Sequence, residues 1–195
     1  APTTSFWDCG EFIATSVIMG VPHPPGTPFF LLLGNFFSQL PIFADTGARV
    51  NLISPIFSAF AVMFLYLIIV QLIEEWHGKA KTWPDFLITY GSAIIGALTF
   101  AFTDSHWFNA VEAEVYSIST FFTSIVVWLI LKWSTNSGHA GNVRYILIIA
   151  YMFGLAIGIH LLNLLALPFI ALIVYFNKYE FKVGTFIATM GITLF

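Results

Sequence analysis

Two carboxylates three residues apart, near the start of the chain, are the strongest candidates for chemistry. Asp8 and Glu11 lie in the segment Trp7-Asp-Cys-Gly-Glu11, and residues at this spacing share one face of a helix. Such a pair suits a general base beside a second carboxylate that orients a substrate or holds a cation. The alternative is structural, because acids in the first turn of a helix complement its dipole. The spacing alone does not choose between the two.

Two further segments place imidazoles in irregular backbone. His23 lies in Val21-Pro-His-Pro-Pro-Gly-Thr-Pro28, whose prolines exclude a helix and would aim the ring rigidly. A solvated histidine in a helix connector is the alternative. His160 and Asn163 interrupt an otherwise apolar stretch. A break at membrane depth is tolerated where it lines a polar cavity or is buried in protein, so both a binding role and a satisfied interhelical hydrogen bond fit.

Five more side chains are candidates for binding a substrate. Glu112 and Glu114 precede an apolar run, where acids within a membrane helix would indicate a site but acids at its start would only cap it. Tyr116 and the aromatic loop that carries His106 lie beside them. Arg49 could meet a phosphate or pair with Asp45, which lies four residues away.

Several kinds of site have no motif in this sequence. There is no glycine-rich nucleotide loop and no His-Glu-x-x-His zinc spacing, and no local motif supports Ser-His-Asp catalysis. Cys9 is the single cysteine and is expected to be a small buried residue. We therefore expect neither a cofactor nor a resident metal, although the Asp8 and Glu11 pair leaves a divalent cation possible.

The composition indicates an integral membrane protein. Of 195 residues 58% are hydrophobic and 9% charged, whereas soluble domains are typically about one quarter charged. Mean hydropathy is +0.88. A soluble fold of this size could not bury so much apolar surface, so we expect an all-α, polytopic transmembrane helical bundle in contact with membrane lipids. No basic stripe is present to neutralise phosphates, which excludes a nucleic-acid partner.

The basic residues assign the two sides of that bundle. Six of the seven lie in three short segments between apolar runs: Lys79 and Lys81, Lys132 and Arg144, Lys178 and Lys182. Clustered lysines and arginines mark the cytoplasmic loops of multi-span proteins. The acids and histidines named above then face the extracytoplasmic side, where we expect the chemistry.

Apolar runs and turn residues divide the chain into two parts. Residues 1–46 are expected to form an extracytoplasmic loop with interfacial helices near 3–19 and 29–40, and residues 47–195 the bundle. Residues 145–176 are too long for one untilted crossing, and the charge rule favours a break near 158–163 over one long tilted helix. The expected spans are 48–73, 84–103, 111–133, 145–160, 161–176 and 183–195.

Four motifs together resemble one family. They are Ser5-Phe-Trp-Asp-Cys-Gly-Glu-Phe-Ile-Ala-Thr-Ser16, His23-Pro-Pro-Gly-Thr-Pro28, Glu112-Ala-Glu-Val-Tyr-Ser117 and Gly158-Ile-His-Leu-Leu-Asn163. In this order they resemble bacterial membrane proteins related to the eukaryotic transmembrane protein O-mannosyltransferase of plexin-type domains. That family is similar to GT-C glycosyltransferases, which take a sugar from a polyprenyl-phosphate carrier on the extracytoplasmic side. The resemblance implies a chain truncated at both ends, from a multi-pass protein of the bacterial inner membrane.

The resemblance also implies a mechanism. GT-C enzymes carry an essential Asp in the first outer loop, and Asp8 with Glu11 matches it. Asp8 would accept the proton of a Ser or Thr hydroxyl, on a protein or other acceptor such as a glycan, as that oxygen displaces the lipid phosphate with inversion. Glu11 would orient acceptor or sugar. Binding of the substrates is assigned to the remaining candidates: His23, Arg49, His106, Glu112, Glu114, Tyr116, His160 and Asn163.

Two other classes of protein fit parts of the sequence. A transporter would explain a helix broken around polar groups in mid-membrane, and solute flux in proteoliposomes would favour it. A non-catalytic scaffold subunit would bind partners tightly and tolerate substitution of Asp8 and Glu11.

Overall fold

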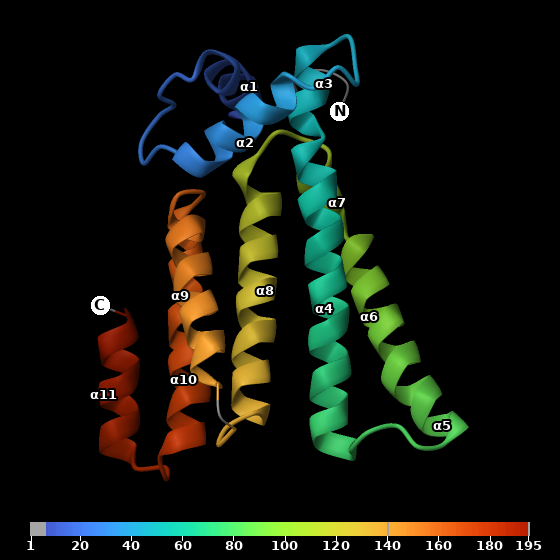
Figure 1. The fold of residues 1–195 in the computed structure, drawn as a ribbon, viewed down its shortest axis with the longest axis vertical. Coiled ribbons are helices and arrows are strands. Elements are labelled where there is room, and N and C mark those ends of the chain that lie inside the picture. Colours follow the sequence, from blue (N-terminus) through green and yellow to red (C-terminus); the bar gives the residue numbers. More distant parts are fainter. Residues whose placement is uncertain (1–6, 140, 195) are drawn as a thin grey trace.

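The structure is a computed structural model that describes residues 7–139 and 141–194, and every regular element in these ranges is helical (Figure 1). The predicted all-α, polytopic bundle is therefore confirmed. In chain order the elements are α1 (Cys9–Ile18), α2 (Pro28–Ser38), α3 (Thr46–Asn51), α4 (Ile53–His77), α5 (Trp83–Phe86), the π-helical turn η1 (Leu87–Gly91), α6 (Ser92–Ala101), α7 (Asp104–Ala110), α8 (Val115–Thr135), α9 (Val143–Ile157), the 3-10 turn η2 (Leu161–Leu165), α10 (Ala166–Lys178) and α11 (Val183–Leu194).

Four helical segments in the described ranges are long and apolar enough to cross a membrane: Thr46–His77, Trp83–Ala101, Val115–Thr135 and Leu161–Lys178. The helix α9 has 15 residues, about 22 Å at 1.5 Å per residue, which is less than a hydrocarbon core of about 30 Å. Ile149 of α9 nevertheless belongs to one apolar cluster with Val126, Leu129, Ile130 and Trp133 of α8. Whether each expected span crosses the bilayer stays a prediction.

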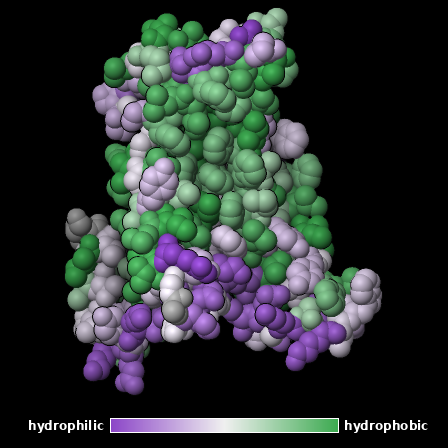
Figure 2. Space-filling view, in the orientation of Figure 1, coloured by the Kyte–Doolittle hydropathy of each residue, from purple (hydrophilic) through white to green (hydrophobic). Residues whose placement is uncertain are grey.

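The two ends of the bundle differ in composition. The six basic residues outside α3 lie at or beyond the ends of α4, α8, α9 and α10 that meet at the lower end in Figure 1. Figure 2 shows hydrophilic residues gathered at this lower end and at the opposite, upper end, with an apolar band between them. The short helices α1, α2 and α3 cover the upper end. The lysines thus gather at one end of the bundle, and which end faces the cytoplasm stays a prediction.

The break between α9 and α10 is held by Asn163, which is 2% exposed. Its side-chain amide donates to the carbonyls of Ala156 and His160 at 3.1 and 2.9 Å. Its oxygen accepts from the hydroxyls of Ser119 and Thr123 on α8, at 3.0 and 3.2 Å. One side chain thus replaces hydrogen bonds that the interrupted helix lacks and ties the break to α8, as an interior without water requires.

The outer helices α1 and α2 pack closely because Gly34 lies against Ser16. Ser16 is fully buried there, and the amide of Asn35 donates to the carbonyls of Ser16 and Val17 at 3.0 and 3.3 Å. At the other end of α2, the backbone amide of Phe29 donates to the carbonyl of Gly158 at 3.0 Å. The helix pair is therefore fixed both internally and to the end of α9.

A single apolar core joins the outer helices to the bundle. Its buried members come from α1 to α4, the 111–114 turn, α8 and the end of α9: Cys9, Phe12, Ile13, Phe30, Leu31, Val50, Ile53, Ala113, Val115, Ile118, Phe122, Ala156 and Ile159. Cys9 is fully buried, as expected, and its thiol donates to the side-chain oxygen of Asn51 at 3.5 Å. The upper layer is thus a packed part of the fold.

Some boundaries differ from those expected. The helix expected near 3–19 begins at Cys9 in the structure, and its residues 3–6 lie outside the described ranges. The loop expected at 103–109 contains the helix α7, because Thr103 and Asp104 favour a helix start that hydropathy does not register. The helix α8 begins at Val115 and not at 111, so Glu112 and Glu114 precede it in a turn.

We expect Gly34→Ala to destabilise the upper layer, because a methyl group at Gly34 would collide with the Ser16 side chain. Overpacking of this kind costs about 1–3 kcal/mol. Gly154→Ala is the matched control, since a methyl group there meets nothing within 4 Å and α9 should gain about 0.5–1 kcal/mol. Thermal unfolding in detergent measures both. A Gly34→Ala midpoint at or above that of Gly154→Ala would contradict the packing described.

Candidate functional site

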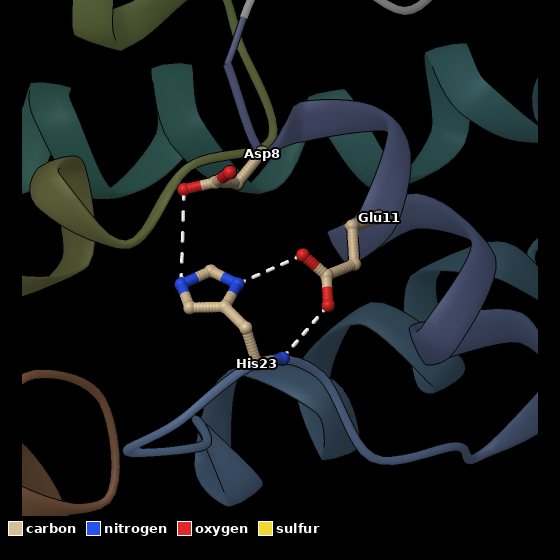
Figure 3. Close-up of side chains that lie close together, drawn as sticks. All are labelled: Asp8, Glu11 and His23. Atoms are coloured by element: carbon tan, nitrogen blue, oxygen red, sulfur yellow. Dashed lines mark hydrogen bonds and ion pairs between the residues drawn. The ribbon is translucent and has the colours of Figure 1, made fainter.

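The first outer helix and the loop after it bring Asp8, Glu11 and His23 together (Figure 3). Asp8 stands at the N-terminal boundary of α1, and Glu11 lies in its first turn. The helix α1 ends at Met19 in a left-handed conformation, and the proline-rich segment then leads the chain back past α1. A hydrogen bond from the amide of Gly26 to the carbonyl of His23, at 3.0 Å, closes the turn that presents the ring.

Glu11 holds His23 with both of its carboxylate oxygens. The backbone amide of His23 donates to Oε1 at 2.7 Å, and the ring Nδ1 lies 2.8 Å from Oε2. The imidazole also lies against Phe12, with ring centroids 5.8 Å apart. These contacts orient the ring. The Glu11 carboxylate is therefore engaged by the loop that carries His23.

The hydrogen bond between the two side chains shifts both titrations. It lowers the pKa of the Glu11 carboxyl, assisted by the hydrogen bond from the His23 backbone. It raises the pKa of His23, a shift that burial opposes and the charges of Glu11, Asp8 and Glu114 reinforce. The ionised carboxylate and the imidazolium are therefore each favoured by the other.

Asp8 faces the opposite edge of the same ring. Its Oδ2 lies 3.8 Å from His23 Nε2, which is too long for a direct hydrogen bond. The Asp8 side chain is about half exposed. The two candidate acids therefore differ: Glu11 is hydrogen-bonded to the loop, whereas Asp8 keeps a carboxylate that an incoming group can reach.

Glu114 joins this group from the turn before α8. The charges of Asp8 and Glu112 raise the pKa of the Glu114 carboxyl, and the charge of Glu114 raises the pKa of His23. In sequence, 106 residues separate Glu114 from Asp8 and 91 separate it from His23. Burial raises the pKa of the Glu114 carboxyl to about 7; the charges of Asp8 and Glu112 add to the rise, and hydrogen bonds from the backbone amides of Asp8 and Val115 oppose it. Near neutral pH this carboxyl therefore exists in both protonation states.

The turn that carries Glu114 is anchored below the site. The hydroxyl of Ser54 on α4 donates to the carbonyl of Glu112, and the amide of Glu114 donates to the same carbonyl at 2.9 Å. Glu112 and Glu114 are 2% and 5% exposed. Within the described residues, Oε2 of Glu112 and Oε1 of Glu114 have no hydrogen-bond partner. The site thus has two buried carboxyl groups beneath its half-exposed ones.

A divalent cation, which the sequence leaves possible, would have its candidate ligands here. One ligand atom each from Asp8, Glu11 and His23 lie within 4.8 Å of one another. Carboxylate oxygens suit Mg²⁺, Mn²⁺ and Ca²⁺, and imidazole suits softer metals. To bind the cation, His23 Nδ1 would have to exchange its hydrogen bond with Glu11, whereas Nε2 would not.

Tyr116, His160 and Asn163 form a second group at the same end of the bundle. The rings of Tyr116 and His160 lie 5.7 Å apart, and His160 Nδ1 accepts the backbone amide of Leu162 at 3.0 Å, which caps η2. Asn163 has both amide donors and two acceptor positions in use, the full capacity of this side chain. For Asn163 the geometry favours the interhelical alternative.

Arg49 and His106 lie in other surroundings. The Arg49 guanidinium donates to the backbone carbonyls of Ser38, Phe43 and Ala44 at 2.9, 2.6 and 3.4 Å, which closes the loop before α3. Asp45, its alternative partner, instead caps α3 by accepting the amide of Gly47 at 2.9 Å. His106 packs against Phe100 and lines an apolar hollow of about 470 Å³ between α4, α6 and α7, and burial lowers its pKa.

The sequence did not reveal the pairing of Glu11 with His23 or the approach of Glu114 to Asp8. Glu11 and His23 are 12 residues apart across a helix end and Pro22, so no helical spacing relates them. Ser54, which anchors the Glu112 carbonyl, gave no signal because a serine in an apolar helix is common. The one usable signal was the rigid proline-rich turn around His23. It indicated that the ring has a fixed direction, but not which residue it contacts.

Comparison with known proteins relates the chain to one family. Residues 8–183 match the family described as the protein O-mannosyl-transferase TMEM260 N-terminal domain. The chain is 29% identical over 183 residues to the protein O-mannosyl-transferase tmem260 of Dictyostelium discoideum, covering 86% of this chain and 20% of that protein. To the corresponding protein of Mus musculus it is 27% identical over 150 residues, which are 77% of this chain and 19% of that protein. No solved structure matches it.

The chain thus spans about one fifth of the length of these curated relatives. The match begins at Asp8 and extends to the start of α11, so it includes Glu11, His23, Glu114 and the broken helix. The description of the matching family is that of an N-terminal domain. The chain belongs to the TMEM260 N-terminal domain family, and the two relatives are named protein O-mannosyl-transferases.

Proposed function

We propose that the protein containing this chain is a GT-C-type glycosyltransferase. It transfers a mannose-like sugar from a polyprenyl-phosphate carrier to a Ser or Thr hydroxyl of a protein, by one inverting displacement at the extracytoplasmic end of the bundle. The names of the relatives support transfer to a protein. The lipid-phosphate donor, the inversion and the face follow from the resemblance and the charge distribution, and the location in a bacterial inner membrane belongs to the same proposal.

The observation that carries the proposal is the different state of the two acids on α1. Both carboxylate oxygens of Glu11 are hydrogen-bonded to His23, whereas the Asp8 carboxylate is half exposed and lies 3.8 Å from the ring. A general base must reach the proton that it removes, and an accessible carboxylate beside an oriented imidazole fulfils this requirement. Asp8 is therefore the base, and Glu11 orients the site through His23.

His23 supplies the charge that the leaving group requires. As the hydroxyl oxygen attacks the anomeric carbon, the bond to the lipid phosphate breaks and negative charge grows on the phosphate. The Glu11 carboxylate favours the imidazolium form of His23, which can donate from Nε2 to that phosphate. The hydroxyl proton goes to Asp8. The Nε2 edge of the His23 ring thus faces both the base, Asp8, and the departing phosphate.

The transporter alternative rested on the polar groups at the helix break. In the structure, hydrogen bonds within the fold occupy the whole amide of Asn163 and the Nδ1 of His160. A solute site would need polar atoms directed at the solute. The break is consequently explained by its tie to α8, and the polar groups that remain accessible lie at the outer end, where a transferase is expected to act.

Asp8→Asn should abolish most sugar transfer by the intact protein while leaving its fold unchanged, because the amide keeps the shape but accepts no proton. Loss of a general base lowers kcat by about 10²–10⁴-fold. The rate of acceptor mannosylation measures this, and Asp104→Asn, at an exposed acid on the same side, is the control. Transfer by Asp8→Asn at the rate of the control would show that Asp8 is not the base.

The pH dependence of transfer should contain an ionisation from Glu114. This carboxyl is neutral below its pKa of about 7 and anionic above it. An additional anion beside a departing phosphate opposes the growing charge, so kcat/KM should fall as pH rises through about 7 and beyond. Glu114→Gln removes the titration and should flatten that limb. Profiles from pH 5.5 to 9 that fall identically in both proteins would contradict the role of Glu114.

A further inference from the structure

The lower end of the bundle contains a hollow that the proposed transfer reaction does not use. It has a volume of about 360 Å³ and lies between the lower ends of α4 and α8. Its lining is polar, in contrast to the apolar hollow beside His106. The lining residues are Gln71, Glu74, Glu75, Lys79, Lys132, Thr135 and Asn136. This volume is in the range of small-ligand sites.

The hollow is lined by equal numbers of positively and negatively charged side chains, and these do not form ion pairs with one another. Two lysines and two glutamates line it, and among the described residues the ion pairs involve His23 and not these four. Glu75 accepts the amide of Gln71 at 3.2 Å, and Glu74 accepts the hydroxyl of Tyr90 at 3.4 Å. The ammonium of Lys132 lies 5.7 Å from the Trp128 ring centroid. Unpaired charges of both signs around one cavity match a ligand that also carries both.

A buried amide gives an independent indication of a ligand that donates hydrogen bonds. Gln71 is 5% exposed, and its Oε1 has no hydrogen-bond partner among the described residues. A buried acceptor without a donor costs about 1–3 kcal/mol. The ligand that relieves this cost must bring an N–H or O–H group to the side of the hollow where Gln71 and Glu75 lie.

The position of the hollow defines the kind of molecule that reaches it. Lys79 follows the end of α4 and Lys132 lies in the last turn of α8, at the lysine-rich end of the bundle. Figure 2 shows this hydrophilic end directly below the apolar band. A cavity at that level adjoins the phosphates and headgroups of the cytoplasmic leaflet.

We propose that this hollow binds the headgroup of a zwitterionic aminophospholipid, with the phosphate at Lys79 and Lys132 and the primary ammonium at Glu74, Glu75 and Gln71. A primary ammonium has three N–H donors, which suits two carboxylates and an amide oxygen. A choline headgroup has none and is recognised by aromatic rings, which are absent from this lining. An anionic headgroup would leave both glutamates uncompensated. The bound lipid braces α4 against α8 on the side opposite the chemistry.

Native mass spectrometry of the intact protein in detergent tests the headgroup directly. Phosphatidylethanolamine, phosphatidylcholine and phosphatidylglycerol with identical acyl chains are added at equal concentrations. Because a hydrogen bond to a charged group contributes about 1.5–3 kcal/mol, phosphatidylethanolamine should bind about tenfold or more tightly than the other two. Equal retention of the three lipids would overturn the proposal.

Two variants separate the two halves of the headgroup. Glu75→Gln weakens the ammonium half, so phosphatidylethanolamine should lose most of its advantage over phosphatidylcholine. Lys132→Met weakens the phosphate half and should lower the affinity for both lipids by a similar factor. Lys182→Met, at an exposed lysine on the same face but outside the hollow, should change neither value. Unaltered selectivity in Glu75→Gln would contradict the placement of the ammonium.

Soluble glycerophosphoethanolamine distinguishes a lipid from a free small molecule. It is the same phosphodiester with the same charges but without acyl chains, so it should displace bound phosphatidylethanolamine only at a large excess. Displacement at concentrations equal to that of the lipid would overturn the assignment of the hollow to a phospholipid.

Discussion

The outer site depends on one interaction, the two hydrogen bonds that the Glu11 carboxylate accepts from His23. A loop with four prolines between Val21 and Pro28 cannot use helical hydrogen bonds, so its position must come from contacts with the rest of the fold. Glu11 supplies two such contacts, one to the backbone and one to the ring. The same contacts leave Asp8 as the accessible acid and favour a charged imidazole beside it. The proposed division of roles between base and charge stabiliser follows from this one pair.

The pair is effective because the layer that carries it is packed onto the membrane helices. Cys9 and Phe12 flank Glu11 in sequence and belong to the core that also contains residues of α4, α8 and α9. The hydrogen bond from Phe29 to Gly158 links the proline loop to the end of α9. The broken helix, held by Asn163, thus supports the outer site as part of its scaffold.

The sequence predicted the elements that hydropathy, proline and charge determine. Apolar runs and lysine clusters gave the all-α bundle and its two ends, and the prolines around His23 gave a rigid turn. Contacts between distant segments could not be predicted, because Glu114 reaches Asp8 only through the packing of α8 against α1 and α4. Arg49 shows the same limit: two of its three backbone acceptors, Phe43 and Ala44, lie in a loop whose path no spacing rule describes. The start of α8 also depended on Ser54, which holds the preceding turn.

In the proposed mechanism Asp8 and His23 face the lipid phosphate of the donor at the end of the bundle opposite the lysines. A cryo-electron microscopy structure of the intact protein in nanodiscs, with a polyprenyl-phosphate sugar bound, would show this arrangement. We expect density for the donor phosphate within hydrogen-bonding distance of His23 Nε2, with the anomeric carbon on the side of Asp8. Density for the sugar and phosphate of the donor at the lysine-rich end, or in the hollow beside His106, would contradict this placement.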